Sequence, residues 1–180
     1  YKVRYWDPSW RQLLWGRPEA PLDRLIAAGF DGVFLDVIDA FEFWGPDGES
    51  GLDRASAARD MVELVKALAA YARQKKPGFL VMPQNGEALL AERDYLEAID
   101  GIAVEDLFYD DERPVKPQET ARRSGFLNPA RQAGKAVLVT DYVRDPGRMR
   151  DLYQRARAAR FVPYAAVRDP DRLPINPLDR

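Results

Sequence analysis

Short apolar runs alternate along the chain with longer stretches whose apolar residues recur at helical spacing. The runs read as strands near residues 2–6, 33–36, 79–83, 102–105, 136–140 and 161–166. Helical spacing and end signals predict helices over residues 8–15, 21–29, 54–76, 87–99, 117–133 with an interruption near Pro129, and 146–160. Strands that alternate with helices and read as continuous apolar runs predict a parallel α/β sheet. Three prolines in the tail from Asp169 predict an extended segment.

Two architectures fit six such strands. They could form an open doubly wound sheet, or six of the eight strands of a barrel, which typically needs about 250 residues. No Gly-rich phosphate loop of the dinucleotide or Walker type follows any of the strands, which weakens the nucleotide-binding version of the open sheet. The pattern therefore favours a (β/α)8 TIM-barrel type, in a single domain over residues 1–180.

Composition narrows the chemistry. The 180 residues contain no histidine and no cysteine, which excludes disulfides, thiol nucleophiles, imidazole or thiolate zinc sites and triads built on an imidazole base. Serine occurs only at four positions, whereas Asp and Glu total 29. Any proton transfer is therefore expected from carboxylates, with no cofactor and no metal. The net charge of −2 gives no reason to expect a nucleic-acid partner, and no apolar run reaches the ~18 residues of a membrane span.

The acidic residues are unevenly distributed. Residues 31–53 and 105–112 hold 12 of the 29 acids and not one Lys or Arg. Two solvated loops would explain this segregation. Alternatively, the two stretches line one cleft that attracts a cationic or polyhydroxylated ligand.

A motif that occurs twice in the sequence singles out two of these acids. Residues 31–36 and 100–105 both read Asp-Gly, three apolar residues and a carboxylate. The Asp-Gly pair suits a tight turn and the apolar residues a buried strand, so Asp36 and Glu105 fall at strand carboxyl ends, where barrels build active sites. Each acid could instead cap the following helix. Their position within the base-free stretches favours the site, and a pair of carboxylates is what glycoside hydrolysis requires.

Other strand-end residues suit a sugar ligand. Gln84 and Asn85 offer amide donors and acceptors after their strand, and Asp141 follows the strand at 136–140. Aromatic rings that could stack on sugars lie at strand ends or in rim loops, at Trp6, Trp44, Tyr109, Tyr142 and Tyr164. Core packing is the alternative role for these rings, and for Trp6 and Tyr164 the sequence favours neither role over the other.

The sequence also resembles a known family. The runs Tyr1–Pro8, Gly29–Asp36 followed by Asp39 and Phe41, Pro83–Gly86 and Gly101–Asp106 are similar to glycoside hydrolase family 114, the endo-α-1,4-polygalactosaminidase-like proteins. The resemblance implies a (β/α)8 barrel that cleaves α-linked, galactosamine-containing polysaccharide outside the cytoplasm, although residues 1–30 show no signal-peptide pattern.

Site residues follow from the resemblance by position. Asp36 would be the nucleophile and Glu105 the general acid/base. Substrate contacts or supporting residues would be Asp39, Asn85, Asp106, Asp141 and Tyr142. An acidic rim suits partly deacetylated amino sugars, since free amines are cations near neutral pH.

The sequence departs from the family's pattern in one respect. The family's barrel has two strands before the Tyr5-Trp6-Asp7 segment, so the first two βα units are expected to be absent from this chain.

Two other functions compete with glycoside hydrolysis. They are a non-catalytic polysaccharide-binding barrel and a divalent-metal enzyme with Asp36, Asp39 and Glu105 as ligands. The sequence carries no signal for an oligomeric state.

Overall fold

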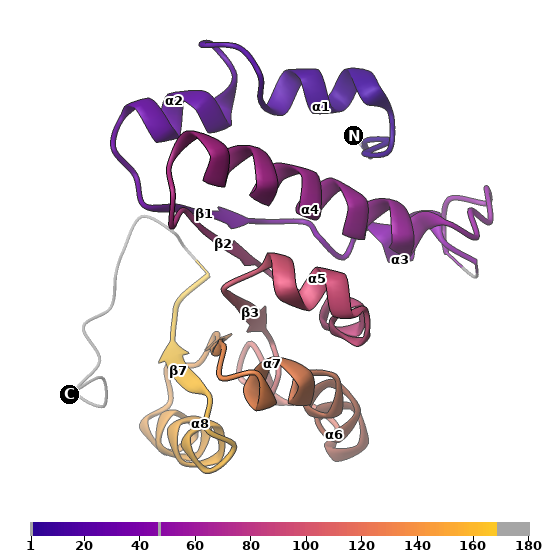
Figure 1. The fold of residues 1–180 in the computed structure, drawn as a ribbon. Helices are drawn as coiled ribbons and strands as arrows, with labels where there is room; N and C mark the ends of the chain where they lie inside the picture. The colour runs from indigo at the N-terminus through magenta and orange to yellow at the C-terminus, as the bar shows by residue number, and fades with distance from the viewer. Residues whose placement is uncertain (1, 47, 169–180) are drawn as a thin grey trace. The chain divides into compact units, whose positions relative to one another are not determined.

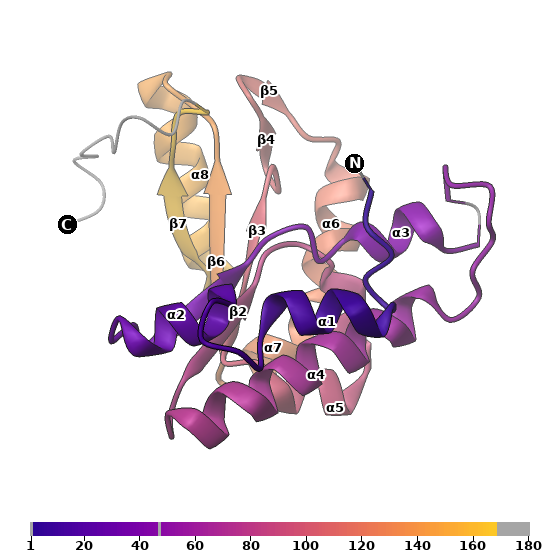
Figure 2. The same ribbon diagram turned by 90° about the horizontal axis from the view of Figure 1, so that it is seen from above.

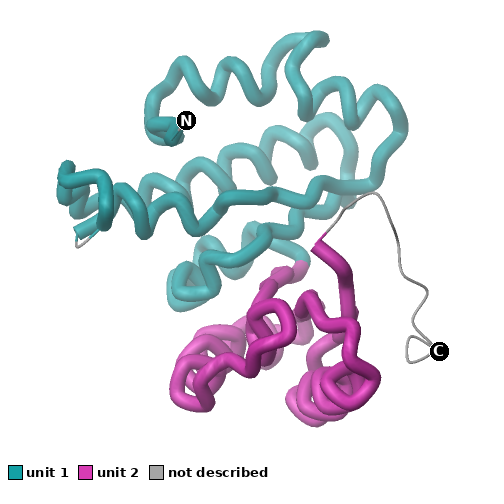
Figure 3. Tube along the Cα trace, turned by 180° about the vertical axis from the view of Figure 1, so that it is seen from behind, with its two compact units in different colours: residues 1–100 teal, residues 101–180 magenta. Residues whose placement is uncertain are grey.

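The computed structural model describes residues 2–46 and 48–168. The chain divides into two compact units, residues 1–100 and 101–180 (Figure 3). The tail expected from Asp169 lies outside the described residues.

Unit 1 consists of a parallel strand pair and the helices around it (Figure 1). Its elements are α1 (Pro8–Leu14), α2 (Pro21–Ala27), β1 (Gly32–Leu35), α3 (Ala40–Trp44), α4 (Ala57–Lys75), β2 (Leu80–Pro83), the 3₁₀ helix η1 (Glu87–Ala91) and α5 (Arg93–Ala98). β1 and β2 pair in parallel, with Leu35 opposite Pro83. On one face Val81 is fully buried, whereas Phe34 and Leu80 on the other are 54% and 50% exposed.

Unit 2 is built on a three-stranded parallel sheet of order β3-β6-β7. Its elements are β3 (Gly101–Glu105), β4 (Tyr109–Asp110), β5 (Arg113–Pro114), α6 (Pro117–Phe126), α7 (Asn128–Gln132), β6 (Ala136–Asp141), α8 (Pro146–Ala158) and β7 (Val162–Ala165). Figure 2 shows β6 and β7 side by side, with α8 packed against β7. The short strands β4 and β5 form an antiparallel hairpin that the sequence pattern did not indicate.

Five of the six predicted strands are confirmed, and the strand expected at residues 2–6 is wrong. Residues 5–7 form a turn, in which the Asp7 amide bonds to the Arg4 carbonyl at 2.9 Å. Asp7 then caps α1, since its carboxylate accepts the Ser9 amide. The Tyr5 hydroxyl bonds to the Ala57 carbonyl at 2.7 Å, so Tyr5 packs against the start of α4.

The predicted helices are confirmed with two refinements. The stretch at 87–99 is divided into η1 and α5, because Glu92 is extended. The interruption expected near Pro129 falls at Leu127, between α6 and α7.

The α/β class with parallel sheets is therefore confirmed. Within the described ranges the strands form two parallel sheets and a hairpin, and no closed barrel. None of the described helices is both long and apolar enough to cross a bilayer.

Candidate active site

The carboxyl end of the unit 2 sheet brings three side chains to one face. The register places Glu105 opposite Thr140, and Thr140 opposite Tyr164. Since side chains alternate along strands, these three residues project from the same side of β3, β6 and β7. All three are half-buried, so the row is accessible while supported by its neighbours.

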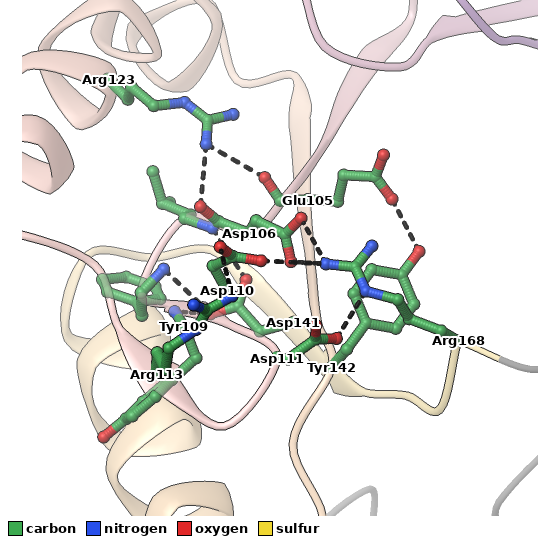
Figure 4. Close-up of polar contacts among 12 residues, drawn as sticks. Glu105, Asp106, Tyr109, Asp110, Asp111, Arg113, Arg123, Asp141, Tyr142 and Arg168 are labelled. Carbon is green, nitrogen blue, oxygen red and sulfur yellow. Dashed lines mark hydrogen bonds and ion pairs between the residues drawn. The ribbon is translucent and has the colours of Figure 1, made fainter.

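The Glu105 carboxylate has a direct partner in the residue that follows β6. The Tyr142 hydroxyl donates to Glu105 Oε2 at 2.6 Å, a contact drawn in Figure 4. Burial, and then the Glu105 carboxylate, raise the pKa of Tyr142 to about 12. The tyrosine therefore remains a hydrogen-bond donor at neutral pH and fixes one oxygen of the candidate acid.

Asp141, the last residue of β6, points to the opposite side from Thr140 and is fully buried. Its Oδ1 accepts the Leu107 amide and its Oδ2 the amides of Phe108 and Tyr109, each at 2.9 Å. Burial raises the pKa of Asp141 despite these three donors. Asp141 thus holds the backbone turn that follows β3, and contributes to the site by supporting it.

Asp106 begins this turn and lies within a cluster of acids that share one cation. Its φ of 52° takes the chain out of β3. The Arg168 guanidinium bonds to both Asp106 oxygens, at 2.8 and 3.0 Å, to Asp110 at 3.2 Å and to Asp111 at 2.5 Å. Burial is the largest influence on the Asp106 carboxyl and raises its pKa, although Arg168 opposes the shift.

Basic residues from elsewhere in the chain therefore balance the acidic stretch at 105–112. Besides Arg168, Arg148 pairs with Glu112 at 2.7 Å. Arg123 binds the backbone instead, donating to the carbonyls of Glu105 and Asp106 at 3.0 and 2.9 Å. Sequence reasoning missed these arginines because their partners lie 17 to 62 positions away.

Two predicted aromatic contacts differ in exposure. Tyr109 is only 6% exposed and its hydroxyl donates to Asp151 at 2.7 Å, which fits the packing alternative. Tyr164 is half-buried in the row with Glu105, which keeps it available to a ligand.

The strand ends of unit 1 bring Asp36, Gln84 and Asn85 onto adjacent turns. The exposed Asp36 follows β1, and its Oδ1 accepts the Val37 amide at 2.8 Å. The Gln84 amide bonds to the Leu35 carbonyl at 2.8 Å, which continues the pairing of β1 with β2. Val37 and Asn85 both have left-handed backbones, with φ of 61° and 58°.

Asp39 and Trp6 also belong to unit 1. Asp39 precedes α3 and lines, with Lys2, Glu42, Phe43 and others, a pocket of about 320 Å³. Trp6 packs edge-on against Trp44, with the Arg54 guanidinium 4.3 Å from its ring centre. The packing alternative therefore accounts for much of the Trp6 ring.

The structure thus gathers the predicted residues at two strand ends. Around Glu105 lie Asp106, Asp141 and Tyr142, and around Asp36 lie Gln84 and Asn85. Within the residues that the structure describes, no group of three or more Asp and Glu side chains is arranged to hold a metal ion.

Parallel α/β units whose strand carboxyl ends carry acids, amides and aromatic rings are arranged as in many carbohydrate-active proteins. The chain belongs to glycoside-hydrolase family GH114, whose sequence profile matches residues 1–174.

Two curated relatives carry the description of uncharacterized protein. A protein of Thermotoga maritima is 38% identical over 94% of this chain and 53% of its own length. One of Methanocaldococcus jannaschii is 35% identical over 98% of this chain and 52% of its own length. The chain therefore spans about half the length of the curated relatives it matches.

Two solved structures share the fold. The glycoside hydrolase domain of PelA from Pseudomonas aeruginosa has a TM-score of 0.67 and 23% identity, covering 99% of this chain and 64% of the PelA domain. Aspergillus fumigatus Ega3 has a TM-score of 0.65 and 18% identity, covering 92% of this chain and 59% of Ega3.

Proposed function

We propose that the protein is a glycoside hydrolase that cleaves α-linked, galactosamine-containing polysaccharide. The observation that carries the proposal is the half-buried Glu105 carboxylate at the end of β3, held by the Tyr142 hydroxyl at 2.6 Å. The Ega3 structure, with which this chain shares its fold, is a complex with galactosamine. Free amino groups on such a polymer are cations near neutral pH and suit a site whose proposed reacting groups, Asp36 and Glu105, are both carboxyls.

The proposed chemistry uses two carboxylates and retains the anomeric configuration. Protonated Glu105 donates its proton to the glycosidic oxygen while Asp36 attacks the anomeric carbon and forms a glycosyl ester. Glu105, now ionised, takes a proton from water, which attacks the same carbon and releases Asp36. Asp36 suits the nucleophilic role because it is exposed and already accepts the Val37 amide.

The finer architecture is also part of the proposal. The TM-score of 0.67 to the PelA domain supports a (β/α)8 barrel domain to which residues 1–180 belong. A polysaccharide substrate, met outside the cytoplasm, is the expected partner.

Release of reducing ends from partly deacetylated polygalactosamine tests the function. In the full-length protein, Glu105→Gln and Asp36→Asn should each abolish release, because each removes a group that exchanges a proton or bonds to the sugar. Glu112→Gln is the matched control, since Glu112 belongs to the same acidic stretch but pairs with Arg148.

Two results would contradict the proposal. Unchanged release in Glu105→Gln or Asp36→Asn would remove that residue from the mechanism. Polymer binding without release at any pH by the unsubstituted protein would instead establish the binding-domain alternative.

A further inference from the structure

Arg168, which the sequence did not indicate as a site residue, contacts four residues around the candidate site. It follows β7 by three residues and is 45% exposed at its side chain. Its guanidinium bonds to Asp106, Asp110 and Asp111, and its central carbon lies 4.1 Å from the centre of the Tyr142 ring. Figure 4 shows the guanidinium lying over this ring, whose hydroxyl reaches Glu105.

The contacts restrict Tyr142 from one side. A guanidinium is planar, and it can donate to several carboxylates while one face rests on an aromatic ring. The three aspartates fix the plane of the guanidinium, and the plane in turn limits rotation of the Tyr142 ring. The hydroxyl of a ring so limited stays directed at Glu105 Oε2, 2.6 Å away.

The same contacts offset repulsion beside Glu105. Asp106 directly follows Glu105, and Asp110 and Asp111 also converge on Arg168. Without a shared cation these carboxylates would repel one another, since like charges close together in a partly buried setting are destabilising. The turn after β3 would then be less well ordered at the point where Glu105 must be held.

We propose that Arg168 is a positioning residue for Glu105, acting through Tyr142 by stacking on its ring and through Asp106 by ion pairing. This inference rests on the proposed function, in which Glu105 is the acid/base. Arg168 itself touches none of the reacting atoms. Its contribution is the orientation of the Glu105 carboxyl, and a misplacement of about 1 Å at a catalytic group can cost about 100-fold in rate.

A double-mutant cycle in the full-length protein tests the connection through Tyr142. Arg168→Gln should lower kcat on polygalactosamine by about 10- to 100-fold with little change in KM. In a Tyr142→Phe background, Arg168→Gln should lower kcat much less, because the hydroxyl that it orients is already absent. Equal losses in both backgrounds would overturn the proposal and leave Arg168 a general structural contact.

Two further variants separate geometry from charge and from folding. Arg168→Lys keeps the charge but cannot stack flat while bonding to three carboxylates, so it should recover activity only in part; full recovery would overturn the role of stacking. Arg148→Gln, which removes an arginine of the same unit paired with Glu112, should leave kcat within twofold. Thermal unfolding of each variant confirms that it is folded.

A second readout does not depend on turnover. With Glu carboxyl carbons labelled by ¹³C, the Glu105 signal, assigned by its loss in Glu105→Gln, should move in Tyr142→Phe and in the same direction in Arg168→Gln. An unmoved signal in Arg168→Gln would overturn the proposal. Absence of hydrolysis in the unsubstituted protein would contradict the proposed function alone, because the carboxyl signal still reports on Arg168.

Discussion

Tyr142 donates its phenolic hydrogen to Oε2 of Glu105 across 2.6 Å, although 37 positions separate the two residues. The parallel pairing of β3 with β6 creates the contact, since Glu105 ends one strand and Tyr142 directly follows the other. Buried apolar side chains set the register of the strands, and this register places Glu105 and Tyr142 side by side at the sheet edge. The bond also has a measurable consequence for the pH dependence of stability.

Ionisation of Tyr142 should lower the stability of the folded protein in alkali. Burial and the Glu105 carboxylate raise its pKa from 10 to about 12. The folded protein therefore binds more protons than the unfolded chain between pH 10 and 12, and the free energy of unfolding falls as pH rises through that window. Urea unfolding at pH 9 to 11.5 should show a steeper decline for the unsubstituted protein than for Tyr142→Phe. Parallel declines would contradict the raised value.

Asp141 should be the most costly acid to remove in unit 2. Asp141→Ala leaves the amides of Leu107, Phe108 and Tyr109 without their acceptor, and an unsatisfied buried donor costs about 1–3 kcal/mol. We expect a loss of about 3 kcal/mol or more in denaturant unfolding. Asp31→Ala, which removes an 88% exposed carboxylate paired with Lys76, should cost much less, because exposed ion pairs contribute little to stability. Similar losses in both variants would argue against the buried role.

Val37 carries backbone strain beside Asp36. A β-branched residue at φ 61° is strained by about 1–3 kcal/mol, and the Val37 side chain is 55% exposed, so it adds little packing. Val37→Gly should therefore raise the free energy of unfolding by about 1 kcal/mol. Val162→Gly is the matched control. Val162 is 57% exposed in a regular strand, so glycine at this position should lower the free energy of unfolding. Destabilisation in both would show that the turn is not strained.

Tyr95 and Tyr5 form a second matched pair. The Tyr95 hydroxyl is buried and has no hydrogen-bond partner in the part of the chain that the structure describes. Tyr95→Phe should thus leave stability unchanged or raise it by up to about 1 kcal/mol. Tyr5→Phe should lower it by about 1 kcal/mol, because the Tyr5 hydroxyl bonds to the Ala57 carbonyl at 2.7 Å. Thermal melts of the two variants, shifted in the same direction, would contradict this difference.

Local patterns were sufficient to predict most of the elements. The repeated Asp-Gly motif located the ends of β1 and β3, because a turn, an apolar strand and a terminal acid each leave a compositional signal. The expectation that both strands are buried holds for β3, whereas Phe34 of β1 is 54% exposed. The apolar run at residues 2–6 misled the prediction, since Tyr5 faces a helix carbonyl and no strand of the described residues pairs with the segment. The hairpin of β4 and β5 was missed because strands of two residues have no period to detect.

The candidate site was predicted less completely than the fold. The positions of Asp36 and Glu105 at strand ends were sufficient to predict them as candidate site residues. The function of Asp141, in contrast, depends on three backbone amides more than 30 positions away. Arg168 lies outside both acidic stretches, and only tertiary folding brings it to Asp106, 62 positions earlier. Pairings of this kind follow from topology and leave no trace in local spacing.

The shared cation at Arg168 makes the site sensitive to ionic strength. Its ion pairs with Asp110 and Asp111 are half-exposed, and dissolved salt screens such charges over a Debye length of about 8 Å at physiological concentration. The short bond between Tyr142 and Glu105 needs no long-range attraction and is screened far less. At 1 M salt the Debye length shortens to about 3 Å, so the acidic turn should loosen before Glu105 loses its hydrogen bond to Tyr142.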